Sequence, residues 1–366
     1  MAVVKGPSPI GPWHDPLGTF LLPESLGSSL NPPTCIRDPG VLQDDDGSYY
    51  IVFGACSGPV QPDDSCYYLS ELHEDMVSYR EPVHLSVRGA MGPYGPGKAD
   101  DKPFLHKRGR VYYLSWGVFY ATSTYVYGPY EYQGTFLETE FLAPPFRYGN
   151  ESAQPWYTRE DWADRHGSFV EFHGQWYFFC NDRSHSDARE KGFWPGGFRD
   201  TIASPAYVHY FDNGTIAPII VDAKGVGSHN TTAESTLPAE NYFLLDAGSK
   251  QQRGGHGFKL TDLSDRSTVV YKKVSFPKQS VVPAVRVAVT TACTDSMHVD
   301  LAQLQSNGSK ALLARCMVPP GMIIGAEFTD IRCDRALPTD SEVDLHLSFH
   351  GCNGTNFLEI AAIAFH

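Results

Sequence analysis

Three segments in the first half of the chain repeat one pattern of apolar and polar positions. Each has a turn glycine, then two aromatic side chains and an apolar run: Gly47–Phe53, Gly109–Leu114 and Gly174–Phe179. An apolar strand ending in a polar turn precedes each copy, and the copies recur at intervals of about 60 residues. A β-rich repeat of this length is typical of β-propeller blades, so the pattern predicts one strand hairpin per blade. Coincidence among tyrosine-rich strands is the alternative.

A shorter repeat concerns the start of the chain. Tyr120–Ser123 leads after a short turn into Gly128–Tyr130, and Val3–Gly6 leads in the same way into Gly11–Trp13. The later copy follows a strand of the first repeat, whereas in the earlier copy that strand would lie before Met1. We therefore expect the chain to begin inside a blade, as an N-terminally incomplete version of a longer protein.

The last third of the chain changes to short runs in which apolar and polar residues alternate. Such runs, separated by Gly, Pro and Asn, are 284–289, 297–301, 343–349 and 358–363. This period of two predicts a β-sandwich, and no segment has the pattern of a helix of normal length. The predicted fold class is therefore all-β: an incomplete five-bladed-type propeller over residues 1–227, a polar linker over 228–237, and a β-sandwich (jelly roll) over 238–366.

The charge composition of the chain limits the classes of partner that we expect it to bind. The 366 residues carry 29 Lys and Arg against 42 Asp and Glu, a net charge of −13, with no basic block. This balance argues against nucleic acid or an anionic membrane surface as the main partner. The sequence has no run of about 18 apolar residues, which is the length that a membrane-spanning helix needs.

The eight cysteines divide evenly between the two halves of the chain. Five N-x-S/T sequons accompany them, at Asn150, Asn213, Asn230, Asn307 and Asn353. Together they indicate an oxidising, glycosylating compartment, although any single sequon can also be an unused surface loop. We expect a secreted, extracellular glycoprotein with disulfide bonds, whose signal peptide is not in this chain.

The residues suited to chemistry are carboxylates near the repeats. The chain has no G-x-S-x-G elbow, P-loop or H-E-x-x-H motif, and Asp44–Gly47 fits a hairpin turn better than a calcium loop. Sugar hydrolysis needs two carboxyl groups and aromatic faces. Asp38 precedes a proline and an apolar strand, and Asp101 has a matched place one repeat later. Solvated turn carboxylates are the alternative for both.

An ordered succession of motifs over roughly residues 3–227 resembles glycoside hydrolase family 43. The matching segments are Ile36–Tyr50, Lys102–Ser115, Tyr120–Ser123 with Gly128–Tyr130, and His166–Tyr177. The resemblance implies a five-bladed propeller that hydrolyses glycosidic bonds with inversion, as an α-L-arabinofuranosidase or β-xylosidase on plant cell-wall polysaccharide. It implies no cofactor for the chemistry.

The same resemblance implies roles for the carboxylates. Asp38 matches an aspartate that modulates the pKa of the acid and orients it. Asp101 falls where the family has its general-acid Glu, but it is one methylene shorter, and Lys102 follows where the family has a small residue. A neighbouring lysine lowers a carboxyl pKa, which opposes proton donation. The general base belongs to the family's first blade, which we expect to be absent from this chain. Asp15 is no substitute for that base. We therefore expect the glycosidase activity of this chain to be impaired.

Other site residues follow from the resemblance and from the aromatic pattern. His166 matches a central-channel histidine that contacts a metal or water, and Arg199 matches an arginine that reaches the substrate. A buried, hydrogen-bonded histidine and a surface ion pair are the alternatives. For stacking on sugar rings we expect three aromatic side chains: Phe104, Trp116 and Trp176.

The last third, about residues 238–365, resembles carbohydrate-binding module family 6. Residues 239–243 match its opening strand, and 269–276 and 358–365 match later strands. Glu240 and Glu359 fall near the module's structural calcium ligands. No tryptophan is present as a sugar platform in this region, so buttressing the propeller is the alternative to sugar binding.

The sequence therefore predicts a monomeric glycosidase acting on arabinose- or xylose-containing polysaccharide or oligosaccharide. The alternative is a non-catalytic, lectin-like propeller that binds carbohydrate in an aromatic channel.

Overall fold

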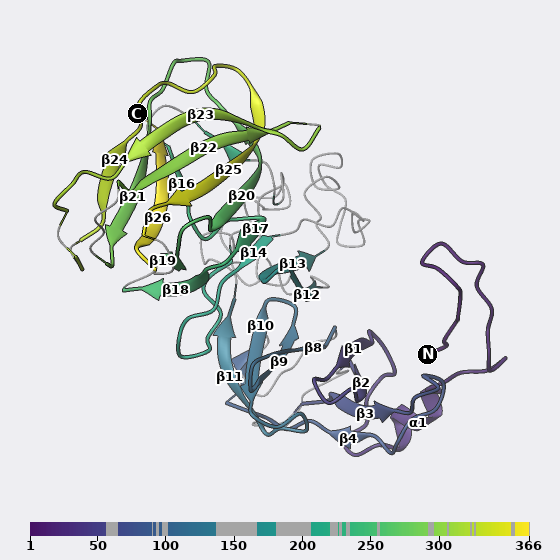
Figure 1. Ribbon diagram of the computed structural model, residues 1–366. Coiled ribbons are helices and arrows are strands. Elements are labelled where there is room, and N and C mark those ends of the chain that lie inside the picture. The colour runs from purple at the N-terminus through teal and green to yellow at the C-terminus, as the bar shows by residue number, and fades with distance from the viewer. Residues whose placement is uncertain are drawn as a thin grey trace, which may run out of the picture. The chain divides into compact units, whose positions relative to one another are not determined.

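The computed structural model shows an all-β chain (Figure 1). It describes residues 1–55, 65–89, 91–92, 95–96, 102–136, 167–180, 206–219, 226, 229–231, 235–254, 257–291, 296–305, 307–322, 324–325, 327–352 and 356–365. Within these ranges the helix assigned is α1 (Glu24–Ser29), which is six residues long. No helix in the described residues is long and apolar enough to cross a membrane. The predicted fold class is thus confirmed as all-β.

Two sheets carry the first two copies of the aromatic repeat. The first has the order β1 (Gly40–Gln43), β2 (Tyr49–Phe53), β3 (Tyr68–Leu72), β4 (Val83–His84). The second has the order β5 (Val87–Arg88), β11 (Tyr130–Thr135), β10 (Phe119–Ser123), β9 (Val111–Trp116), β8 (Phe104–Arg108). A small pair joins β6 (Met91–Gly92) to β7 (Gly95–Pro96). Both main sheets are antiparallel meanders, apart from β5, which pairs parallel with β11.

Each copy of the repeat forms the second strand of a hairpin. The pairs are β1 with β2 and β8 with β9. The third copy lies in a sheet of order β12 (Gly167–Phe172), β13 (Gln175–Cys180), β14 (Ala206–Val208). The prediction of one hairpin per repeat is confirmed, while the number of blades stays a prediction.

The shorter repeat also adopts one local conformation in both copies. Gly11 and Gly128 have φ of 83° and 77°, a region that favours glycine. A Cβ on either would lie 2.9 Å from the aromatic ring two residues on, in Trp13 or Tyr130. The same turn is therefore built twice from the same residue types.

The chain divides into two compact units. The first comprises residues 1–170, 178–204 and 218–221, and the second 171–177, 205–217 and 222–366. The predicted domain boundaries at 227 and 238 stay a prediction.

Part of the predicted linker takes part in the second unit. β15 (His229–Asn230) pairs parallel with β20 (Thr268–Ser275), and β16 (Thr236–Pro238) pairs with β26 (Leu358–Phe365). The cause is visible in the side chains. Leu237 is 3% exposed in the core, and Thr231 donates from its N–H and its hydroxyl to the Ser275 carbonyl, at 3.0 and 2.7 Å.

The second unit contains a β-sandwich of two sheets. One has the order β15, β20, β25 (Glu342–His350), β22 (His298–Leu304), β23 (Lys310–Met317), with β17 (Leu244–Asp246) beside β20. The other has the order β18 (Ser249–Arg253), β19 (Gly257–Leu263), β26, β21 (Pro283–Val289), β24 (Thr329–Arg332), with β16 beside β26. Aliphatic and phenylalanine side chains of both sheets form one core.

The alternating runs predicted as strands are confirmed as β21, β22, β25 and β26. The prediction of a strand over 239–243 is wrong. The Asn241 N–H donates to the Pro238 carbonyl at 3.2 Å, so these residues turn between β16 and β17 instead. Cys316 on β23 is bonded to Cys333, which follows β24, and this disulfide ties one sheet to the other. Cys66 and Cys352 are also disulfide-bonded, whereas Cys35 is a free thiol.

Candidate active site

Asp38 lies two residues before β1, half-buried, with φ of 50°. The backbone next to Asp38 is held by Gly54, whose N–H donates to the Arg37 carbonyl at 3.2 Å. A Cβ on Gly54 would lie 2.3 Å from the Cys66 carbonyl oxygen, so only glycine fits there. The close packing of β2 and the chain before β3 therefore fixes the conformation at Asp38.

The start of β8 repeats this arrangement with a lysine. Lys102 precedes Pro103, has φ of 67°, is 5% exposed and lies two residues before β8. The local equivalent of Asp38 is thus Lys102, and Asp101 stands one residue earlier along the chain. Left-handed backbone at a residue with a side chain costs about 1–3 kcal/mol and persists where the surroundings enforce it.

The two strand starts lie against each other. A Cβ on Gly40, the first residue of β1, would lie 3.1 Å from the Pro103 carbonyl oxygen and 3.2 Å from Phe104 Cα. The structure therefore brings the chain segment of Asp38 next to that of Lys102 and Phe104. Of the predicted site residues, Asp38 and Phe104 lie on these two neighbouring segments.

The other ends of the same strands are joined by a buried ion pair. The Lys107 ammonium on β8 donates to a carboxylate oxygen of Asp44 and lies 2.9 Å from Asp45 Oδ2. The Tyr112 hydroxyl donates to Asp44 Oδ2 at 2.6 Å. Burial acts to raise the pKa of Asp44, but the bonds from Lys107, Tyr112 and the Asp45 N–H hold that pKa below its usual value. The pair fixes the first sheet against the second.

The turn between β1 and β2 is confirmed as a hairpin turn. The Gly47 N–H donates to the Asp44 carbonyl at 3.0 Å, and the Asp44 N–H donates to the Ser48 carbonyl at 2.8 Å. Asp44, which lies in this turn, is the residue that forms the ion pair with Lys107.

The aromatic side chains differ in exposure. Trp116 is 1% exposed and packs on Tyr67, with ring centroids 5.8 Å apart. Its ring therefore belongs to the core, and a part in sugar binding stays a prediction. Phe104 is half-buried. Trp176, in the second unit, is half-buried and meets Tyr210 edge-on at 5.8 Å.

A buried histidine, His106, lies two residues after Phe104 on β8. His106 is 3% exposed and stacks between Tyr113 and Phe169, at centroid distances of 4.7 and 4.4 Å. Desolvation lowers the pKa of His106 to about 3, so the ring is neutral at physiological pH. The sequence pattern did not single out His106, because a histidine on a strand has no periodic signal that separates core from site. Three predicted residues, Asp101, His166 and Arg199, lie outside the described residues.

Glu240 and Glu359 are the predicted calcium ligands of the second unit. Burial raises the pKa of Glu240. Glu359 Oε1 accepts bonds from Lys259 Nζ at 2.7 Å and Thr261 Oγ1 at 3.1 Å. In the described part of the chain, neither glutamate belongs to a group of three ligand-type side chains. Calcium binding by these two glutamates therefore stays a prediction.

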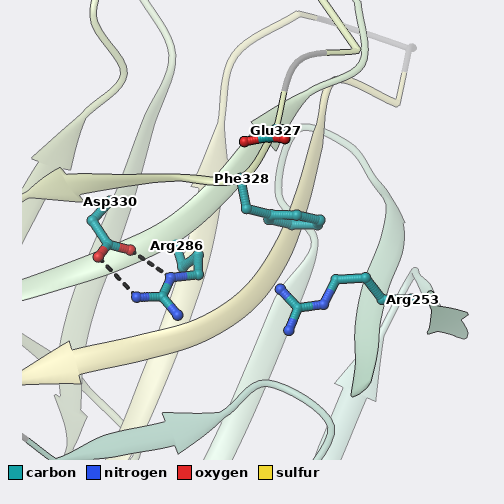
Figure 2. A pocket seen from close by; sticks show the side chains of 5 residues that line it. All are labelled: Arg253, Arg286, Glu327, Phe328 and Asp330. Carbon is teal, nitrogen blue, oxygen red and sulfur yellow. Dashed lines mark hydrogen bonds and ion pairs between the residues drawn. The ribbon is translucent and has the colours of Figure 1, made fainter. Parts of the chain in front are cut away.

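An open pocket of about 440 Å³ lies on the sandwich. Figure 2 shows the five side chains that line it: Arg253, Arg286, Glu327, Phe328 and Asp330. Arg286 forms a bidentate pair with Asp330 at 2.8 and 3.0 Å, and the Arg253 guanidinium carbon lies 5.3 Å from the Phe328 ring centroid. These residues are far apart in the sequence, so no motif predicted the pocket. It offers an aromatic ring and charged groups to a polar ligand.

The part of the chain that contains these hairpins matches a known family. The chain belongs to glycosyl hydrolases family 43, whose family model matches residues 1–208. The resemblance inferred from the motifs is thereby confirmed for the family.

Three known proteins illustrate the similarity. The arabinoxylan arabinofuranohydrolase of Bacillus subtilis is 28% identical over 166 residues, which are 38% of this chain and 29% of that protein. The chain thus spans under a third of the length of that relative. A crystal structure of a family 43 arabinoxylan arabinofuranohydrolase from Bacillus subtilis, in complex with cellotetraose, aligns with TM-score 0.47 and 19% identity over 100% of this chain and 73% of that one.

The third similar protein concerns a module alone. A β-1,3-glucan-binding CBM6 from Bacillus halodurans aligns with TM-score 0.32 and 19% identity over 38% of this chain and 98% of that one. At these scores neither structural alignment carries an argument about function.

Proposed function

We propose that this protein is an inverting glycoside hydrolase acting on arabinose- or xylose-containing polysaccharide of the plant cell wall. The observation that carries the proposal is the pair of strand starts at β1 and β8. Both hold a non-glycine residue in the left-handed region, at Asp38 and Lys102, and they pack against each other. Backbone held in this way clusters at functional sites.

In this proposal Asp101 is the general acid. It stands directly before Lys102 in the sequence, and Lys102 has a φ of 67°. An inverting enzyme needs the acid about 6.5–9.5 Å from a second carboxylate that activates water. Asp38 would then orient the acid and tune its pKa. The general base is not assigned to a residue of this chain.

The adjacent lysine affects the acid in a defined direction. Lys102 is 5% exposed, so its charge lies in a medium that screens it less than water does. A lysine next to Asp101 in the sequence stabilises the carboxylate form of that side chain and lowers its carboxyl pKa. We therefore expect activity to have its optimum on the acid side of neutrality, because the acid must be protonated to donate.

Substrate contacts are proposed for the aromatic and polar groups. Phe104 and Trp176 are half-buried and so leave part of each ring for stacking on sugar. Arg199 and His166 are proposed to contact substrate and the central channel. The arabinoxylan-active relative in Bacillus subtilis supports the substrate class. The sandwich is proposed as a carbohydrate-binding module, and the protein as a secreted monomer.

Hydrolysis of arabinoxylan by the natural protein tests the proposal. We expect release of arabinose or xylose, and a fall in kcat of at least about 100-fold in Asp101→Asn, because loss of a general acid costs that much. Asp100→Asn is the matched control, one residue earlier with the same change of charge, and should retain activity. Retained arabinoxylan binding without sugar release would favour the lectin-like alternative. Equal activity of Asp101→Asn and wild type would remove Asp101 as the acid.

A further inference from the structure

Two histidines and an aspartate meet on one face of the sandwich sheet that contains β22, β23 and β25. His298 and Asp300 are alternate residues of β22, so they share a face, and His350 on β25 is the register partner of His298. His298 Nε2 lies 3.8 Å from Asp300 Oδ1, and His350 Nε2 lies 3.8 Å from Asp300 Oδ2. One ligand atom from each residue can be chosen so that all three lie within 4.8 Å of one another.

The arrangement is held from outside the three residues. Arg315 on β23 donates to both oxygens of Asp300, from Nε at 2.6 Å and Nη2 at 2.8 Å. The two imidazole rings stack at 4.6 Å between centroids, inclined by 18°. The intervening Val299 and Leu301 are fully buried in the core, which fixes the strand beneath the cluster.

The cluster is accessible from solvent. The side chains of His298, Asp300 and His350 are 18%, 15% and 36% exposed. Neutral imidazole is the form of histidine that ligates metals.

We infer that these residues form a binding site for one divalent transition-metal ion of the Zn²⁺ class. His298 and His350 supply imidazole nitrogens, Asp300 supplies one carboxylate oxygen, and water completes the coordination. Zinc holds such ligands at about 2.0–2.2 Å in a tetrahedron, which places ligand atoms about 3.4 Å apart, so atoms now up to 4.8 Å apart must close by as much as about 1.4 Å. Imidazole donors favour zinc, copper or nickel over calcium.

The arginine has a part in this site. With one oxygen of Asp300 on the metal, Arg315 keeps its bond to the other oxygen and orients the carboxylate. Hydrogen bonds of this kind to a ligating carboxylate are a common feature of metal sites. The half-exposed His350, at the end of β25, is the residue free to tilt toward the ion.

Calorimetric titration of the metal-free chain with Zn²⁺ alone tests the inference. The wild type should bind one ion through this cluster, and His350→Gln should bind it at least about tenfold more weakly, since even an outer-shell partner is worth about 10–100-fold. His298→Gln should show the same loss. His14→Gln, which removes an exposed histidine of the first unit, is the control and should bind as the wild type.

Two further readings make the result decisive. Thermal unfolding without metal should be unchanged in His350→Gln, which shows that the loss is not misfolding. With Co²⁺ as a probe, the wild type should show visible tetrahedral bands without a near-ultraviolet thiolate band, which excludes the free thiol of Cys35 as the ligand. Absence of Zn²⁺ binding by the wild type, or equal binding in wild type and His350→Gln, would overturn the inference.

Discussion

The two compact units differ in where their charged clusters lie. In the first unit, charged and ring side chains are inside: Asp44, Lys102 and His106 are all under 10% exposed. In the sandwich the core is built mainly of aliphatic and aromatic residues, with His346 buried as well, and the charged clusters around Asp300 and Asp330 lie on outer faces of the sheets. The same all-β chemistry thus serves two purposes. One unit fixes strand starts, and the other presents flat surfaces.

The two units need different interactions to be stable. Buried polar groups are tolerated only when they are paired and when the backbone around them is fixed. The first unit therefore depends on close backbone contacts such as that of Gly54 with Cys66, whereas the sandwich depends mainly on buried apolar area.

The largest effect is expected for Gly54→Ala in the first unit. The added Cβ would lie 2.3 Å from a backbone oxygen, and the φ of 139° does not suit alanine. We expect a loss of about 4 kcal/mol in the free energy of unfolding, because overpacking and backbone strain add. Urea denaturation measures it.

A matched glycine supplies the control for this substitution. Gly109 has φ of 57° with nothing within 4 Å of a built Cβ, so Gly109→Ala meets strain without a clash. It should cost about 1 kcal/mol. Equal losses in the two variants would show that the close contact at Gly54 carries no stability.

Next in size is Cys333→Ser in the sandwich. The disulfide to Cys316 spans 17 residues and joins the two sheets. Its removal should lower the free energy of unfolding of the second unit by about 3 kcal/mol. Differential scanning calorimetry should show a lower Tm. Cys35→Ser, at a free thiol, is the control, and a Tm shift as large in Cys35→Ser would contradict the assignment.

A smaller loss is expected for Asp44→Asn. The side chain is 6% exposed and pairs with Lys107, whereas Asp45 is 82% exposed and touches the same ammonium. Because Lys107 keeps Asp45, we expect Asp44→Asn to cost about 2 kcal/mol and Asp45→Asn less than about 1 kcal/mol. Equal costs, measured by urea denaturation, would place the pair's value at the surface.

The same pair gives the first unit a pH dependence. The pKa of Asp44 is lowered in the folded chain from its value of 3.8. A carboxyl group with a depressed folded pKa stabilises above its unfolded pKa, and that stability is lost as pH falls through the folded pKa. Stability of wild type should therefore decrease on acidification below about pH 4 more steeply than that of Asp44→Asn. Parallel curves would contradict this.

The smallest effect is expected for Asp330→Asn on the sandwich. Arg286 and Asp330 are 37% and 34% exposed, so water and salt screen their pair. We expect a change of less than about 1 kcal/mol that vanishes at high salt, measured by denaturation with and without NaCl. A loss comparable to that of Asp44→Asn would end the contrast between the two units.

The sequence was sufficient for the hairpins and the sandwich strands, because their signals are local. Alternation along 284–289 and the Gly-aromatic repeats report the period of two directly. The opening strand expected over 239–243 failed because a turn bonded to the Pro238 carbonyl replaced it. Leu237 and Thr231 joined the sandwich from a stretch whose composition is typical of a linker, since one buried leucine outweighs polar neighbours.

Site prediction was limited for a different physical reason. Asp38 and Phe104 were found because proline and repeat position mark strand starts. The equivalence of Asp38 with Lys102 required backbone φ angles, and the cluster of His298, Asp300 and His350 required strand register. Neither is encoded in spacing along one segment.

The kcat of Asp38→Asn on arabinoxylan tests the central claim most directly, namely that the fixed strand starts of the first unit form a glycosidase site. The natural protein and the variant should have the same Tm, because Asp38 is only half-buried. We predict that kcat falls by at least about 100-fold, since misplacing a catalytic group by about 1 Å costs that much. An unchanged kcat in a folded Asp38→Asn variant would contradict the claim.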